Sequence, residues 1–198
     1  MPSPWLTPVR LTAPACTLEP LAPAHHDELV DAARDGELWK LWYTTVPEPA
    51  GMRAEIDRRL GLQATGAMLP FTVRDARGRA VGMTTYMRAD AANRRVEIGS
   101  TWTAASAQRT GLNTAAKRLL LGHAFEALEC IAVELRTHFC NHQSRRAIER
   151  LGAKLDGVLR SHSLGRDGTL RDTCVYSVTA AEWPTVRVHL DWLIARPR

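Results

Sequence analysis

The chain lacks long apolar runs, paired cysteines and an abundance of lysine. Its four cysteines, Cys16, Cys130, Cys140 and Cys174, are widely scattered and form no CxxC motif. A chain of 198 residues with 45% hydrophobic content can bury its own core, so these cysteines indicate reduced thiols rather than a disulfide framework. No apolar run approaches the length of a membrane span, and the N-terminus has no basic-then-apolar leader pattern. We therefore expect a cytoplasmic protein with no membrane segment.

Arginine supplies most of the positive charge. Of the 26 basic residues only Lys40, Lys117 and Lys154 are lysines, and the formal net charge is +5. Guanidinium groups suit phosphate ligands. However, no basic run alternates with aromatic residues, which argues against nucleic acid as a partner. The excess of arginine by itself indicates only a basic surface.

The order of apolar patterns predicts one mixed α+β domain over residues 1–198, with a core at about 10–180. Strands are expected at 15–21, 68–74, 80–88, 95–102, 131–139, 155–163 and 170–178. Helices are expected at 23–34, 52–62, 112–128, 143–151 and about 180–196. Residues 75–78 and 166–168 carry hairpin signals. The last helix has an apolar stripe that covers either the core or a partner, so a homodimer stays open.

The most informative segment joins the fourth predicted strand to a strongly amphipathic helix. Its residues are Gln108, Arg109, Thr110, Gly111, Leu112, Asn113 and Thr114. The first amides of a helix have no helical partner, and the aligned peptide dipoles leave partial positive charge there. The segment therefore predicts a site for a phosphate or pyrophosphate.

Other motifs flank this loop in a fixed order over most of residues 10–180. They are Glu97-Ile98-Gly99, Asn141-His142-Gln143-Ser144, Arg150-Leu151-Gly152-Ala153 and Gly157-Val158-Leu159-Arg160. With the loop, this order resembles the GCN5-related N-acetyltransferase (GNAT) superfamily, and looks closest to its ribosomal-protein N-terminal acetyltransferases. The resemblance implies a twisted, mixed but mostly antiparallel sheet of about seven strands, flanked by helices and splayed between the fourth and fifth strands.

The resemblance also implies acetyl-CoA as the acyl donor, with no metal. The pyrophosphate is expected on the amides of residues 109–114, and the pantetheine arm beside Thr101, Trp102 and Thr103, with Asn141 also in reach. The chain departs from the family at Asn113, where a small residue is usual. Asparagine tolerates unusual backbone angles and caps helices, so we expect the loop to survive.

Glu97 is the predicted catalytic base. It lies just before the cofactor segment, and a carboxylate there can accept a proton from the amine, directly or through water. An ion pair with Arg94, Arg95 or a neighbouring strand explains the same residue equally well. Both interpretations stay open.

Ser144 is the second predicted catalytic residue. In many family members a tyrosine protonates the leaving thiolate, but this chain has no tyrosine between Tyr86 and Tyr176. Ser144 can hydrogen-bond the CoA sulfur. Alternatively, Ser144 or Asn141 caps the helix that begins there, and capping is the favoured role for Ser144.

The resemblance implies an N-acetyltransferase that acts on an amine, either a protein N-terminus or a small molecule, by direct attack in a ternary complex. A catalytically silent CoA-binding or sensing domain is the alternative. Trp39, Trp42 and Tyr43 can line an acceptor pocket, although apolar residues at helical spacing favour core packing. His138, Cys140 and His142 alternate, but no fourth metal ligand stands near them in the sequence.

Overall fold

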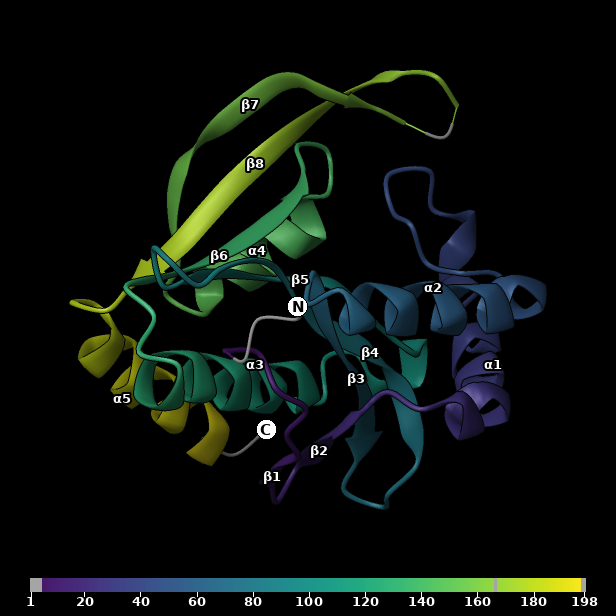
Figure 1. Ribbon diagram of the computed structural model, residues 1–198, viewed down its shortest axis with the longest axis horizontal. Coiled ribbons are helices and arrows are strands. Elements are labelled where there is room, and N and C mark those ends of the chain that lie inside the picture. The colour runs from purple at the N-terminus through teal and green to yellow at the C-terminus, as the bar shows by residue number, and fades with distance from the viewer. Residues whose placement is uncertain (1–4, 166, 197–198) are drawn as a thin grey trace.

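The strands of this protein form one continuous sheet. The computed structural model describes residues 5–165 and 167–196 (Figure 1). In sheet order, the described strands are β1 (Leu11–Ala13), β2 (Cys16–Pro20), β3 (Met68–Asp75), β4 (Ala80–Asp90), β5 (Arg95–Thr103), β6 (Ala132–His138), β8 (Leu170–Thr179) and β7 (Lys154–Leu164). The β5–β6 pair is parallel and the other neighbouring pairs are antiparallel. The predicted fold class is confirmed, with β1 as an additional strand.

Helices cover both faces of this sheet. The α-helices are α1 (His26–Arg34), α2 (Met52–Ala64), α3 (Leu112–Gly122), α4 (His142–Arg150) and α5 (Trp183–Ala195). A π-helical turn, His123–Ala127, continues α3, and short 3-10 turns occupy Pro23–His25, Leu38–Lys40, Pro49–Gly51 and Ala105–Ala107. The hairpin expected at 75–78 is present, closed by a bond from the Gly78 N–H to the Asp75 carbonyl. In the second hairpin, Arg166 lies outside the described residues.

Two hydrophobic clusters lie on opposite faces of the sheet. The larger one packs α3 and α5 against the strands through residues such as Leu120, Val133 and Leu190. The smaller one packs α1 and α2 against the sheet through Leu29 and Ile56. In Figure 1, α1 and α2 lie together on one side of the sheet, and α3 lies beside α5 on the other.

The parallel pairing between β5 and β6 is short. It comprises Arg95 with Ala132, Val96 with Val133, and Glu97 with Glu134. Beyond Glu97, the rest of β5 has no paired partner on β6 among the described residues. This is the splay expected between the fourth and fifth predicted strands. The long β7–β8 hairpin arches over the sheet on the side where the splay opens (Figure 1).

The C-terminal helix covers the core. Val186 and Leu190 of α5 are buried in the larger cluster, and Leu193 packs against it. The predicted apolar stripe therefore faces this chain's own sheet. In the part of the chain that the structure describes, no helix has the length and apolar character that a membrane crossing requires.

Packing of α5 predicts a large difference between two positions on this helix. Leu190 is 0% exposed and Val188 is 66% exposed. Leu190→Ala leaves a cavity and should lower the free energy of unfolding by about 2–5 kcal/mol. Val188→Ala on the same helix should change it by less than about 0.5 kcal/mol. Urea unfolding of both variants checks this, and equal losses would contradict the packing described.

Candidate active site

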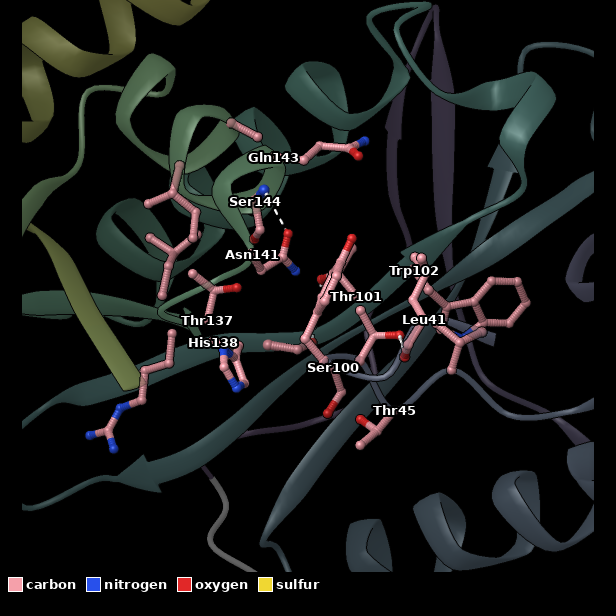
Figure 2. Close-up of a pocket in the computed structure, with 18 of the residues that line it drawn as sticks. Leu41, Thr45, Ser100, Thr101, Trp102, Thr137, His138, Asn141, Gln143 and Ser144 are labelled. Carbon is pink, nitrogen blue, oxygen red and sulfur yellow. Dashed lines mark hydrogen bonds between the residues drawn. The ribbon is translucent and has the colours of Figure 1, made fainter. Parts of the chain in front are cut away.

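The splay opens a cleft of about 1130 Å³ between the two helical layers. Its walls come from β5, the loop before α3, the first turns of α3 and α4, β6 and the β7–β8 hairpin. Figure 2 shows Asn141 and Ser144 of the α4 start lying opposite Ser100 and Thr101 of β5. The predicted cofactor-binding residues that line the cleft are Thr101, Trp102, Thr103, Gln108, Arg109, Gly111, Asn113, Thr114, Asn141 and Ser144.

Two predicted cofactor-binding residues do not line the cleft. The Thr110 hydroxyl donates to the Ala107 carbonyl at 2.7 Å, which fixes the loop from within. Leu112 is buried in the larger hydrophobic cluster.

Gly111 begins helix α3 with a left-handed backbone. Its φ is 94°, and the Leu112 N–H donates to the Thr110 hydroxyl at a long 3.4 Å. Arg109 has φ 62°, whereas Asn113 already lies inside the helix and needs no unusual angles. The loop therefore does not need Asn113 to adopt unusual backbone angles. Gly111 takes the left-handed conformation, which glycine adopts easily. The first-turn amides of α3 can therefore bind an anion.

A β-bulge lies in the part of β5 that borders the cleft. Thr85 pairs with Gly99, and Met83, two residues away on β4, pairs with Trp102, three residues away on β5. One extra residue therefore sits on β5, and Ser100 there has φ 47°. Such a bulge reverses the alternation of side chains. Ile98 belongs to the cluster under α3, whereas Trp102 belongs to the cluster under α1 and α2.

Glu97 is the last residue of β5 paired with β6, and its side chain lies at the apex of the splay. Glu97 is 6% exposed and lines the cleft. Its Oε2 lies 3.0 Å from Arg88 Nε of β4 and 3.4 Å from Arg136 Nε of β6. Neither contact has hydrogen-bond geometry, and Oε2 has no hydrogen-bond partner among the described residues.

The environment of Glu97 raises the affinity of its carboxylate for a proton. Burial raises the pKa of this carboxyl above its usual range, and this outweighs the lowering by the charges of Arg88 and Arg136. The carboxylate is thus both ion-paired and turned toward the cleft. The ion-pair partners come from neighbouring strands, while Arg94 pairs with Glu129 and Arg95 pairs with Glu134.

Asn141 caps helix α4. Its Oδ1 accepts a hydrogen bond of 3.1 Å from the Ser144 backbone N–H (Figure 2). The capping side chain therefore belongs to Asn141, and the capping role favoured for Ser144 is wrong. Both side chains line the cleft. The helix cap uses the side-chain oxygen of Asn141 and fixes the orientation of its side chain. The Nδ2 group is therefore still available to donate a hydrogen bond to a ligand.

Trp42 and His138 form an aromatic wall at the other end of the cleft. Their ring centroids lie 5.0 Å apart in an edge-on arrangement. Trp42 is 57% exposed, so core packing is the wrong interpretation for this residue. His138 Nδ1 accepts from the Cys140 N–H at 3.0 Å, and burial lowers the pKa of its imidazole. No group of three metal-binding side chains occurs in the described parts of the chain.

Lys117 is a residue of the cleft that the sequence analysis did not single out. It is buried on α3, and its Nζ donates to Thr101 Oγ1 at 2.8 Å and to Thr84 Oγ1 at 3.2 Å. Burial lowers the pKa of this amine from 10.5 to about 7. The signal in the sequence was a lysine between Ala116 and Leu120, on the apolar side of the predicted helix.

A single sheet split between two parallel strands, with a glycine-started helix at the split, defines the architecture of the acetyltransferases that the sequence resembles. Comparison of the sequence with models of known protein families gives the same assignment. The family model described as "Acetyltransferase (GNAT) domain" matches residues 16–154. The chain belongs to this family of GNAT acetyltransferases.

Three relatives illustrate this membership. The chain is 36% identical over 106 residues to the ribosomal N-acetyltransferase YdaF of Bacillus subtilis, a match that spans 54% of this chain and 57% of that relative. It is 31% identical to a GCN5-related N-acetyltransferase from Brucella melitensis, with a TM-score of 0.85 and coverage of 97% and 88% of the two chains. Mycobacterium smegmatis RimJ, in complex with CoA-disulfide, is 23% identical with a TM-score of 0.78 over 94% and 93%, and shares the fold.

The burial of Lys117 predicts a pH-dependent stability. Because its pKa is about 7 when folded against 10.5 for the ordinary amine, the unfolded chain binds more protons between these two values. Stability from this group therefore rises with pH through that window and is constant below it. Lys117→Met removes the titration. In urea unfolding, wild-type stability minus variant stability should increase from pH 7 to pH 10.5, and parallel curves would contradict this assignment.

Proposed function

We propose that this protein transfers the acetyl group of acetyl-CoA to an amine, either a protein N-terminus or a small molecule, within a ternary complex. One observation carries the proposal. The glycine-begun start of α3 and the edge of β5 that does not pair with β6 open into the same cleft as the buried carboxylate Glu97. An anion site, a backbone edge and a base are thus combined in one place. Membership in the GNAT family and the RimJ complex with CoA-disulfide support this donor.

The donor set of the cleft fits a nucleotide thioester. The first-turn amides of α3 would hold the pyrophosphate, and Arg109 and Arg146, which also line the cleft, add positive charge. The edge of β5 at Thr101, Trp102 and Thr103 would hold the pantetheine arm through backbone groups that do not pair with β6, and Gln108, which donates to the Thr103 carbonyl at 3.1 Å, would give up that bond where the arm takes its place. When bound, acetyl-CoA supplies an activated acetyl group.

Glu97 would remove the proton of the amine. Only a neutral amine is nucleophilic, and a lysine side chain has a reference pKa of about 10.4 against about 7.7–8.0 for an α-amine. A base therefore accelerates reaction of either class at neutral pH. The raised pKa of Glu97 brings its proton affinity closer to that of the amine. Asn141 Nδ2 and the Ser144 hydroxyl supply hydrogen-bond donors at the mouth of the splay.

The acceptor would enter beneath the β7–β8 hairpin. Trp42 and His138 form one wall there, and His162 and Arg171 of the hairpin line the other. The ribosomal N-acetyltransferase name of one relative favours a protein N-terminus as acceptor. A screen of peptides and small amines with labelled acetyl-CoA, read by mass spectrometry, tests this proposal. Tight CoA binding without transfer to any acceptor would support a silent CoA-binding domain instead.

Donor binding is predicted to depend on Gly111. Gly111→Asp adds a negative charge beside the anion site and strains a backbone with φ 94°. The dissociation constant of CoA should rise at least about tenfold. Gly78→Asp is a matched control, because Gly78 also has a positive φ of 80°, in an exposed hairpin away from the cleft. Calorimetry with CoA compares the two, and equal affinities would exclude this anion site.

The base role predicts a pH profile for Glu97→Gln. Wild-type kcat/KM should rise with pH as Glu97 loses its proton, over a limb placed above the ordinary range of a glutamate. Glu97→Gln should lose that limb and lower kcat/KM by about 10²-fold or more, while CoA affinity is kept. Steady-state release of CoA across pH measures both. A variant with the wild-type profile would leave Glu97 as an ion-pair residue only.

A further inference from the structure

The bulge in β5 has an unfavourable backbone conformation and lacks regular pairing with β4, so it needs contacts from other elements. Ser100 adopts φ 47°, a left-handed conformation that is unfavourable for any residue with a side chain. The extra residue also interrupts the β4–β5 ladder between Gly99 and Trp102. A partly buried carbonyl in such an interruption needs a partner from elsewhere.

Arg59 of α2 supplies this partner. Its side chain is 2% exposed, and Nη2 donates to the Ser100 carbonyl at 3.2 Å. Nη1 donates to Thr85 Oγ1 at 2.7 Å, on the β4 residue that pairs with Gly99 beside the bulge. Nε donates to Glu55 Oε1 at 2.7 Å. One planar guanidinium thus joins α2, β4 and the bulge of β5.

Burial of this arginine is not explained by the ion pair alone. Removing a guanidinium from water is costly, and a buried ion pair is often no more stabilising than apolar residues of similar size. Glu55 also pairs with Arg58 on the surface of the same helix. The feature that distinguishes Arg59 from Arg58 is the pair of hydrogen bonds to Thr85 and Ser100.

A second basic side chain contacts the bulge from the opposite face. Lys117 of α3 donates to Thr84 and to Thr101, the neighbours in sequence of Thr85 and Ser100. Successive side chains of a strand point to opposite faces, so Thr84 faces α3 where Thr85 faces α2. The bulge is therefore held from both layers, immediately before the three residues that would carry the pantetheine arm.

We propose that Arg59 is a positioning residue for the donor. By holding the Ser100 carbonyl and Thr85, it fixes the bulge and thereby the orientation of the free β5 edge at Thr101, Trp102 and Thr103. This inference rests on the proposed function for the identity of the donor. We call the hydrogen bonds from Arg59 to Thr85 and to the Ser100 carbonyl the clamp. The clamp is present in the ligand-free protein, so it can be tested without CoA.

Arg59→Met and Arg58→Met form a matched pair for the test. Both remove a guanidinium bound to Glu55, but Arg58 is largely exposed and does not contact the strands. We expect Arg59→Met to raise the Kd of CoA and the KM of acetyl-CoA about tenfold, as for the loss of a hydrogen bond to a charged group, with a smaller change in kcat. Arg58→Met should keep wild-type values.

Hydrogen exchange of the ligand-free protein measures directly how well the clamp protects the backbone amides of β5. Amides of residues 100–103 should exchange faster in Arg59→Met than in Arg58→Met. Adding Ser100→Gly to Arg59→Met should recover part of the CoA affinity, because glycine adopts a positive φ without strain. If Arg59→Met does not fold, Arg59→Lys replaces it, with the same direction of change.

The outcomes separate the inference from the proposed function. A variant of Arg59 with a lower Tm but unchanged exchange in β5 and unchanged CoA affinity would overturn the positioning role. Wild-type protein that binds no CoA would instead overturn the proposed donor. In that case faster exchange at residues 100–103 in the Arg59 variant would still show the clamp.

Discussion

The site depends on where the parallel pairing of β5 and β6 ends. The two strands share backbone pairing through Glu97 and Glu134 and then separate. Beyond that point β5 still pairs with β4 at Ile98, Gly99, Trp102 and Thr103, and has no partner on its β6 side among the described residues. Separation of paired strands normally leaves costly unpaired backbone groups. Here the exposed edge is the surface on which an extended ligand can add hydrogen bonds, as a peptide adds to a sheet edge.

Charge is distributed around this separation in an unusual way. Glu97 occupies the apex with an arginine from each neighbouring strand, and two further basic side chains, Arg59 and Lys117, are buried on opposite faces behind the bulge. Buried charges need hydrogen bonds to persist. Arg59 and Lys117 both donate to strand atoms next to the cleft, and Arg59 donates to Glu55 of α2 as well, so the burial of these two side chains is linked to the shape of the site.

Much of this arrangement could be predicted from the sequence, because its signals are local. The expected strand at 95–102 is Arg95–Thr103, and the expected helix at 143–151 is His142–Arg150. Alternation, apolar periodicity and capping residues determine such elements within a few neighbours. The position of Gly111 at the start of α3 could be predicted for the same reason.

Features that depend on a distant partner could not be predicted. The three-residue strand β1 exists because it pairs with β2, and the bulge at Ser100 is defined only by its register with β4. Trp42 has the apolar character of a core residue, yet it lies against His138 at the cleft. Periodicity identifies which residues are apolar but not which surface they cover. The roles of Glu97 and Ser144 likewise depend on groups far away in the chain.

The division of the interior into two clusters has a consequence for divergence within this family. The sheet separates the packing of α1 and α2 from the packing of α3 and α5. Substitutions at sites that share no contacts generally combine additively. Residues that contact only the α1–α2 cluster can therefore change with little effect on the α3–α5 cluster, whereas Arg59, whose side chain reaches the bulge in β5, belongs to neither independent set.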